Sequence, residues 1–200
     1  MNARRAEFER STAETRVVVA LNLDGRGCTQ LASGIGFLDH LLETLARHAR
    51  FDLTLSCEGD LQVDDHHTAE DCGLVLGAAM DRALGERRGI ARFGSALAPL
   101  DESLARSVVD CSGRPFAAVE LELVRDSLGS LACENVSHML VSFAIAARIT
   151  LHVDVLRGVN DHHKAEAGFK ATALALREAV APSGFSDIPS IKDTLGAVRS

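Results

Sequence analysis

Two histidine doublets, each followed by a glutamate three residues further on, are the groups in this sequence best suited to chemistry. They are His66, His67 and Glu70 in DDHHTAED, and His162, His163 and Glu166 in NDHHKAEA. Imidazole nitrogens and carboxylate oxygens are common ligands of divalent transition metals. One such doublet could be only a solvated polar turn at the start of a helix. Two matching doublets with matching glutamates favour a pair of metal sites.

The helical period assigns the two histidines of each doublet to different metal ions. Residues four apart lie on one face of a helix, so His66 can bind the same ion as Glu70. His162 and Glu166 have the same spacing. The second histidine of each doublet is rotated by about 100° around the helix axis, and it should reach another ion. Each of these helices therefore contributes to two sites.

Two lone histidines upstream of the doublets complete the predicted ligand sets. His40 in FLDHLLETL and His138 in VSHMLVSFA each stand on an apolar segment with helical period. Alone, such a histidine could be a hydrogen-bonded core residue, and only the recurrence makes it a candidate ligand. His48 and His152 have no such counterpart, and we interpret them as ordinary residues. The predicted ligands are His40, His67, His162 and Glu166 at one site, and His66, Glu70, His138 and His163 at the other.

The chemical make-up of each ligand set limits the metal and the function. Three imidazoles and one carboxylate, without a thiolate, suit manganese, iron, cobalt or zinc, and a six-coordinate ion would keep positions open for substrate or water. Metal storage could use the same sites. A metal-dependent hydrolase is the other alternative, with an activated water between two ions roughly 3.5–4 Å apart.

The same landmarks occur twice along the chain, which indicates an internal duplication. The doublets are 96 residues apart, the lone histidines 98, and two further glutamates, Glu14 and Glu102, stand 88 apart before similar runs that end near a Gly-Arg pair. No linker rich in Pro, Gly or Ser separates the halves. We therefore predict a single domain over residues 1–200, made of two repeats at approximately 1–91 and 92–185 and a C-terminal tail at 186–200.

Each predicted repeat contains strands and helices in the same order. A β-rich run, a histidine-bearing helix, an alternating strand and a long helix that begins at the doublet follow one another. Asp64 or Asp65, and Asn160 or Asp161, are natural N-caps for the long helices. Because amphipathic helices must bury one face, we expect the helices of both halves to pack together. The predicted fold is α/β, of the α+β type: an internally duplicated unit with two mixed β-sheets sandwiching a layer of helices.

Composition and charge exclude several classes of partner. The formal net charge is −7, and the sequence has no long run of Lys or Arg of the kind found in nucleic-acid-binding proteins. No apolar stretch approaches the roughly 20 residues of a membrane span, and the polar beginning of the chain has no signal-like apolar core. Five cysteines without a C-x-x-C pair argue against a disulfide framework and a thiolate zinc site. We expect a cytoplasmic protein with a small-molecule ligand.

Four segments of the chain together resemble imidazoleglycerol-phosphate dehydratase, an enzyme of histidine biosynthesis. They are GIGFLDHLLETLARH, DDHHTAED, RFGSALAPLDES and NDHHKAEAGFK, and the resemblance covers nearly the whole chain. The resemblance implies a lyase that binds Mn²⁺ at two sites per subunit. Its substrate would be a phosphorylated imidazole, D-erythro-imidazole glycerol phosphate, dehydrated to imidazole acetol phosphate. It also implies self-association into a homo-24-mer, with active sites at subunit contacts.

The implied reaction explains why two metal ions would be needed. Each ion can take one nitrogen of the imidazole ring and stabilise the deprotonated ring, which can then expel the neighbouring hydroxyl. That loss gives a diazafulvene-like intermediate, from which a base removes a proton. By resemblance, Glu14 contacts substrate and is the leading candidate for this acid/base step. A metal-ligating glutamate, Glu70 or Glu166, or a metal-bound water could serve instead.

The phosphate group of the substrate requires positively charged donors, and the two halves differ in this respect. Lys170 follows Glu166 by four residues and shares its helix face, whereas the corresponding residue after Glu70 is Leu74. The resemblance adds four further substrate-binding residues: Arg92, Arg114, Ser190 and Lys192. The tail sequence PSIKD departs from the Pro-Ser-Thr-Lys-Gly of the family, since Ile191 lacks a hydroxyl and Asp193 adds a negative charge.

Overall fold

Apart from two short additional strands in the second half, strands and helices follow one another in the same order in the two halves of the chain. The computed structural model describes residues 4–191 and 195. The first half contains β1 (Arg5–Ser11), β2 (Thr15–Asn22), β3 (Thr29–Ala32), α1 (Gly36–Ala49), β4 (Asp52–Gly59) and α2 (His66–Leu84). The second contains β5 (Phe93–Leu100), β6 (Ser103–Asp110), β7 (Phe116–Glu120), the short strands β8 (Ser127–Leu128) and β9 (Leu131–Ala132), α3 (Cys133–Ala146), β10 (Thr150–Arg157) and α4 (Asp161–Ala179).

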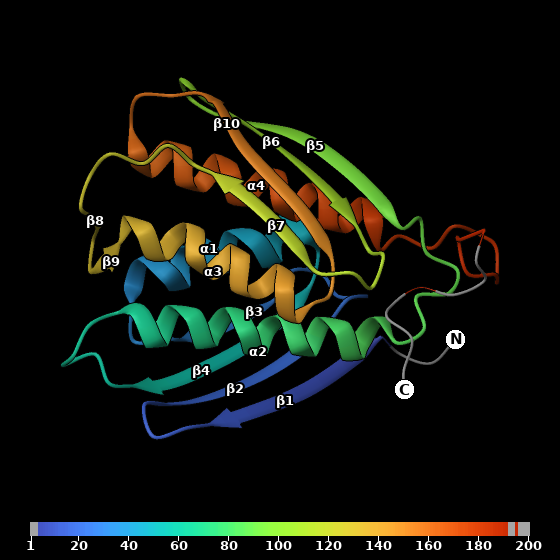
Figure 1. Ribbon diagram of the computed structural model, residues 1–200, viewed down its shortest axis with the longest axis horizontal. Helices are drawn as coiled ribbons and strands as arrows, with labels where there is room; N and C mark the ends of the chain where they lie inside the picture. Colours follow the sequence, from blue (N-terminus) through green and yellow to red (C-terminus); the bar gives the residue numbers. More distant parts are fainter. Residues whose placement is uncertain (1–3, 192–194, 196–200) are drawn as a thin grey trace.

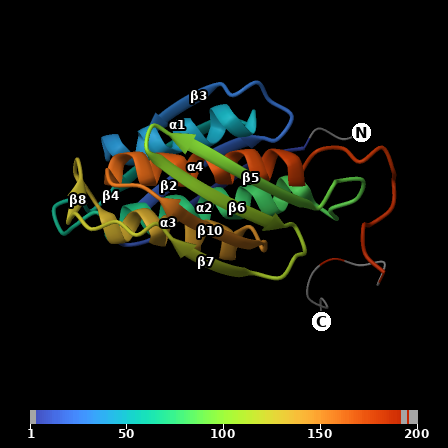
Figure 2. The ribbon, with the colours of Figure 1, turned by 90° about the horizontal axis from the view of Figure 1, so that it is seen from above.

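The strands form two four-stranded sheets with equivalent connections. Their orders are β1-β2-β4-β3 and β5-β6-β10-β7, with a separate β8-β9 pair. In each large sheet the first three strands are antiparallel, and the fourth strand pairs in parallel with its neighbour. Figure 1 shows the helices as a layer between the two sheets, and Figure 2 shows the second sheet lying over that layer. The predicted fold class is confirmed.

Alternating and alanine-rich sequences account for this layered core. In β2 the side chains of Val17, Val19 and Leu21 point inward and are almost fully buried, while the residues between them are more exposed. Helix α4 has buried alanines on several sides, which lets the sheet approach closely. A Cβ at Gly94 of β5 would lie 2.0 Å from the Ala175 carbonyl oxygen. Helix α4 is therefore enclosed by its own sheet on one side and by α1 on the other.

Two glycines bring α2 and α3 into backbone contact. A Cβ at Gly73 would stand 2.6 Å from the Met139 carbonyl oxygen, and one at Gly77 would stand 2.4 Å from that of Phe143. Carbon atoms do not approach carbonyl oxygens so closely, so only glycine allows this helix spacing. The contact sets the distance between the ligand candidates on α2 and His138 on α3.

Some strands are visible only in the structure. The central strands β2 and β6 are the β-rich runs expected in each repeat, and β4 and β10 are the expected alternating strands. The outer strands β1, β3, β5 and β7 were not predicted individually. Outer strands are less buried, and the alternation of β1 is broken by polar residues on both faces. The predicted repeat boundary at residues 91 and 92 lies in the 85–92 segment between α2 and β5, and it stays a prediction.

None of the helices in the described ranges is both long and apolar enough to cross a membrane.

Candidate metal and substrate site

One group of candidate ligands lies where α1 packs against the beginning of α4. Nε2 of His40 lies 3.2 Å from Oε2 of Glu166, and Nε2 of His162 lies 3.3 Å from the same oxygen. The ligand atoms of the three residues all lie within 4.8 Å of one another. The ring of Phe37 packs against His162, with centroids 5.1 Å apart. Three of the four ligands predicted for the first site therefore gather within one chain.

The second group lies in the equivalent position between α2 and α3. It consists of His66, Glu70 and His138, whose ligand atoms also lie within 4.8 Å of one another. The rings of His66 and His138 are stacked with centroids 4.9 Å apart. Nδ1 of His66 donates to the amide oxygen of Asn135 at 3.0 Å, which leaves Nε2 with its lone pair toward the group.

The donor atoms of the second group are suited to a metal ion. Nε2 of His138 is buried and has no hydrogen-bond partner, although Oε1 of Glu70 lies 3.3 Å away. A buried imidazole nitrogen without a partner is costly unless something binds it, and a divalent cation would bind the imidazoles and the carboxylate together. Both groups therefore fit a transition-metal ion with additional ligands from elsewhere.

The second histidine of each doublet lies outside these two groups. Nδ1 of His67 donates to Asp60 at 3.0 Å, and Nδ1 of His163 donates to Glu102 at 2.7 Å. These hydrogen bonds, together with nearby negative charge, raise the pKa of both histidines. A carboxylate on Nδ1 is the usual arrangement for a metal-binding histidine whose Nε2 is the ligand. Within one chain, however, neither histidine joins the group predicted for it.

Residues that precede the doublets hold both helix N-termini in place. The carboxylate of Asp64 accepts the backbone N–H of His66 at 2.9 Å, and the side chain of Asn160 accepts that of His162 at 2.9 Å. Asp65, the alternative capping candidate, accepts a backbone N–H at the start of α3 at 2.6 Å instead. The second doublet therefore follows a side-chain N-cap, Asn160, as its sequence predicts. The N-cap residue of α2 is Asp65, whose side chain makes no hydrogen bond to that helix, and Asp64 binds the N–H of His66 instead.

Lys170 lies beside the first group of ligand candidates. Its Nζ is 2.8 Å from Oε1 of Glu166, the oxygen that does not face the histidines. Burial alone would raise the pKa of Glu166, but hydrogen bonds and charge from Lys170 and His40 outweigh it, so this pKa is lowered. Burial, followed by the charge of Lys170, lowers the pKa of His48. His48, which we interpreted as ordinary, therefore lies near the same cation.

The equivalent glutamates Glu14 and Glu102 have different surroundings. One oxygen of Glu102 accepts the backbone N–H groups of Val159 and Asn160, and the other accepts His163. These bonds hold the pKa of Glu102 far below its usual range. The side chain of Glu14 is 53% exposed, and its oxygen lies 3.7 Å from Nε2 of His67. Glu14 is thus the one of the pair that remains available to a substrate.

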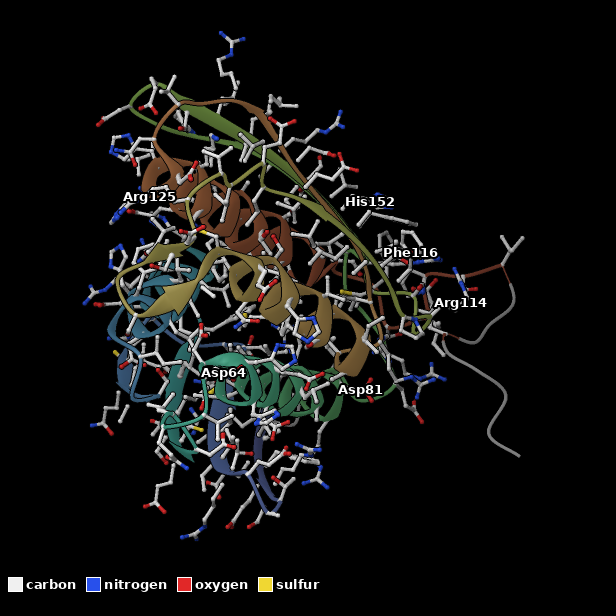
Figure 3. All side chains as sticks on the ribbon, turned by 60° about the vertical axis from the view of Figure 1, so that its left-hand side comes forward. Asp64, Asp81, Arg114, Phe116, Arg125 and His152 are labelled. Carbon is white, nitrogen blue, oxygen red and sulfur yellow. The ribbon has the colours of Figure 1, made fainter. Side chains whose placement is uncertain are left out.

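The other candidate substrate residues lie at the opposite end of the molecule. Arg92 donates to both oxygens of Asp110 and to the Pro189 carbonyl oxygen, and Arg114 lies 3.8 Å from Asp110. Together with Ser190 they line a pocket of about 570 Å³. In Figure 3, Arg114 is far from Asp64, which neighbours the first doublet. Lys192 lies outside the described residues.

The length of helix α4 gives the distance between the doublet at its beginning and Arg92 near its end. The backbone N–H of Arg92 donates to the carbonyl oxygen of Ala179 at the end of α4, whereas His162 is in its first turn. Ala179 follows His162 by 17 positions, which corresponds to roughly 25 Å along the helix at 1.5 Å per residue. The three-carbon chain of a phosphorylated imidazole substrate cannot span that distance. Within one chain, the candidate metal ligands and the Arg92–Arg114 pocket are therefore too far apart to form one site.

Sequence patterns alone did not identify the residues that orient the ligands. Asn135 stands one turn before His138 on α3, a spacing that could have indicated it, but its counterpart in α1 is the apolar Phe37. Asp60 precedes its histidine by a loop, and nothing in its spacing indicates the contact. These orienting residues have no equivalent in the other half of the chain, so the internal repeat, from which the ligands were predicted, could not indicate them.

The match to known proteins extends over most of the chain. Residues 33–176 match the family model described as imidazoleglycerol-phosphate dehydratase. The protein of that name from Saccharomyces cerevisiae is 48% identical over 219 residues, which cover 98% of this chain and 100% of that protein. The protein of that name from Phytophthora nicotianae is 57% identical over 192 residues. These cover 96% of this chain but 42% of that longer protein.

Solved structures agree with this assignment. The imidazoleglycerol-phosphate dehydratase of Staphylococcus aureus superimposes with a TM-score of 0.80 at 32% identity, covering 89% of this chain and 99% of that one. The enzyme of Pyrococcus furiosus, solved in complex with (S)-C348, gives the same TM-score and identity, covering 94% and 99%. The sequence match, the shared fold and the paired histidine-glutamate groups together place the chain in the imidazoleglycerol-phosphate dehydratase family.

Proposed function

We propose that this protein is an enzyme that dehydrates D-erythro-imidazole glycerol phosphate to imidazole acetol phosphate in L-histidine biosynthesis, with Mn²⁺ as its metal. The observation that carries the proposal is the pair of equivalent His-His-Glu groups, each built from residues of both halves of a chain that belongs to this family. A carbon-oxygen lyase needs a site that activates the leaving hydroxyl, and these groups offer two. A cytoplasmic location stays a prediction of the sequence.

The metal ions would be held by the eight predicted ligands, which are His40, His67, His162 and Glu166, and His66, Glu70, His138 and His163. When bound, Mn²⁺ supplies positive charge that favours the deprotonated imidazole ring of the substrate. The residues around the ligands fix their orientation: Asn135 binds Nδ1 of His66, and Asp60 and Glu102 bind the second histidines of the doublets. The imidazoles of His66, His67 and His163 are thus oriented with Nε2 as the ligand atom.

Glu14 is the proposed acid/base residue. It stands on the exposed turn between β1 and β2, and no described hydrogen bond occupies its carboxylate oxygens, in contrast to Glu102. Loss of the hydroxyl from the carbon attached to the ring would give the diazafulvene-like intermediate. A free carboxylate beside the ligand candidate His67 can then remove the proton from the next carbon of the chain, and it can return that proton when the resulting enol becomes the ketone. Glu70 and Glu166 face other ligands and are the alternatives.

The complete site would be formed by more than one copy of the chain. Each three-residue group lacks its fourth predicted ligand, and His67 and His163 present their Nε2 atoms elsewhere. Arg92, Arg114 and Ser190 lie roughly 25 Å along α4 from His162, so they would bind the phosphate of a substrate on another copy. Lys170, beside Glu166, would bind it from the metal side. A homo-24-mer with sites at its subunit contacts satisfies these requirements.

The test is turnover by metal-stripped protein with and without added Mn²⁺, following formation of the ketone product from imidazole glycerol phosphate. We expect activity only after Mn²⁺ is added. Mg²⁺ is the matched control, because it prefers oxygen ligands and should restore little activity. A folded, Mn²⁺-loaded protein that forms no ketone would refute the proposal and favour metal storage.

A further inference from the structure

We propose that Asp71 is a positioning residue that fixes Glu14 in its place for catalysis. The inference rests on the proposed function, since it takes Glu14 as the acid/base residue. Asp71 follows the ligand candidate Glu70 on α2, but its side chain points away from the ligand group, toward β1 and β2 of the sheet. It is 4% exposed and belongs to neither ligand group.

The carboxylate of Asp71 joins both strands of the hairpin that carries Glu14. Its Oδ1 accepts the guanidinium of Arg10, at the end of β1, and its Oδ2 accepts the hydroxyl of Thr15, the first residue of β2. Thr15 is 3% exposed, so this contact is shielded from water. A charged hydrogen bond in such surroundings is stronger than one at the surface. Asp71 therefore ties the hairpin to the helix that bears the metal ligands.

Hydrogen bonds in the turn between the two strands also hold the backbone of Glu14. The hydroxyl of Thr12 accepts the backbone N–H groups of Glu14 and Thr15 at 3.1 and 3.0 Å. The carbonyl oxygen of Glu14 accepts the backbone N–H of Asp60 at 3.1 Å. Glu14 is thus held through its backbone and through the adjacent Thr15, while its carboxylate accepts no described hydrogen bond and lies 3.7 Å from Nε2 of His67.

The second half of the chain lacks this arrangement. The residues equivalent to Arg10 and Asp71 are Ala98 and Ala167, neither of which can form such a bond. There the equivalent glutamate, Glu102, is held by hydrogen bonds to its own carboxylate, which is then not available for a reaction. Glu14 is held through its backbone, so its carboxylate remains available. Among the described residues, the Asp71 contact lies in the half of the chain whose glutamate accepts no described hydrogen bond on its carboxylate.

Two variants test the role of Asp71 without removing a ligand. Asp71→Asn removes the charge, and Thr15→Val removes a single hydrogen bond and serves if the first variant folds poorly. We expect kcat to fall roughly tenfold to hundredfold, because small displacements of catalytic groups cause losses of this size. KM should change little, and the metal content should be unchanged. Arg16→Gln, which breaks an exposed ion pair with Glu9 on the same hairpin, is the control and should keep full activity.

A double-mutant cycle separates positioning from a general loss of structure. If Asp71 acts through Glu14, Asp71→Asn should cause no further loss of activity once Glu14→Gln is present. An equal loss in both backgrounds would overturn the proposal.

Amide hydrogen exchange tests the contact independently of activity. Residues 11–15 should exchange faster in Asp71→Asn and Thr15→Val than in the wild type or in Arg16→Gln, and unchanged exchange would count against the contact. A wild type without turnover would refute the proposed function instead, while the exchange result would still decide whether Asp71 holds the turn.

Discussion

At the scale of single residues, the chemistry depends on what each carboxylate faces. Glu166 uses one oxygen for two histidines and the other for Lys170, whereas Glu70 has no cation four residues further along its helix. The two ligand groups are equivalent in donor atoms but differ in net charge. The group beside Lys170 is therefore the one suited to meet an anionic part of the substrate.

Replacement of Glu166 by Gln is expected to remove one of the two ions per chain, because a neutral amide oxygen binds Mn²⁺ less strongly than a carboxylate. Metal analysis of the purified variant measures this. Glu43→Gln, on the exposed face of α1, is the control and should leave the metal content unchanged. If Glu166→Gln retains the full metal content, the ligand assignment is wrong.

Replacement of Lys170 by Leu, the residue at the equivalent position in α2, is expected to raise KM roughly tenfold to hundredfold. This follows from the loss of a charged hydrogen bond worth about 1.5–3 kcal/mol. Steady-state kinetics with the phosphorylated substrate measures the change. The control is Arg47→Leu, which breaks an exposed ion pair of the same i, i+4 spacing. An unaltered KM in Lys170→Leu would argue against a phosphate contact.

At the scale of elements, the distance between helices determines whether ligands on different helices can share an ion. Each group draws its residues from two helices, α1 with α4 and α2 with α3. In the α2–α3 pair, Gly73 and Gly77 permit backbone contact along the side that leads to His138. A pattern of small residues in α2 thus helps to shape the candidate metal site, although these residues are not themselves ligand candidates.

Replacement of Gly77 by Ala is expected to destabilise the metal-free protein by about 1–3 kcal/mol, because the added Cβ would stand 2.4 Å from the Phe143 carbonyl oxygen. Urea unfolding measures this. In a Glu166→Gln background, metal binding at the remaining group should also weaken, since α3 must move away from α2. Gly36→Ala is the control, because a Cβ there would meet nothing within 4 Å. Equal stability of both variants would contradict the close-contact account.

At the scale of the whole molecule, the two ends of the chain carry different parts of the proposed site. The doublets begin α2 and α4 at one end, and the Arg92–Arg114 pocket lies at the other, as Figure 1 and Figure 3 show for these segments. The helix layer is rigidly packed between two sheets, so the chain cannot fold back to join its own ends. Assembly of several copies would bring the ends together.

A mixture of two inactive variants, Arg92→Ala and Glu166→Gln, is therefore expected to regain activity after the subunits are separated by removal of metal and reassembled with Mn²⁺. Sites in which one copy supplies Arg92 and another supplies Glu166 would be intact. Turnover of the mixture is compared with each variant alone, and light scattering reports the size of the assembly. Mixed assemblies that remain inactive would show that the site is not shared in this way.

The sequence by itself determined the features that depend on residue type and local period. The doublets, the lone histidines His40 and His138, the helix caps and the central strands could all be predicted, because ligand chemistry and helical or strand spacing are properties of short segments. The internal repeat extended these predictions to the layered fold. The prediction that residues four apart would share a group was also local, and His66 with Glu70 and His162 with Glu166 do lie together.

Only the tertiary structure decided which distant residues meet. The helical period states the direction of a side chain, but not which loop or helix faces it, so His67 beside Asp60 and Glu14 could not be foreseen. The same holds for Asp71, whose partners come from a hairpin more than 50 residues earlier in the chain. The separation of Arg92 from the ligands depends on the length of α4 and on how β5 packs along it. These are properties of the packed layers, and no short segment contains them.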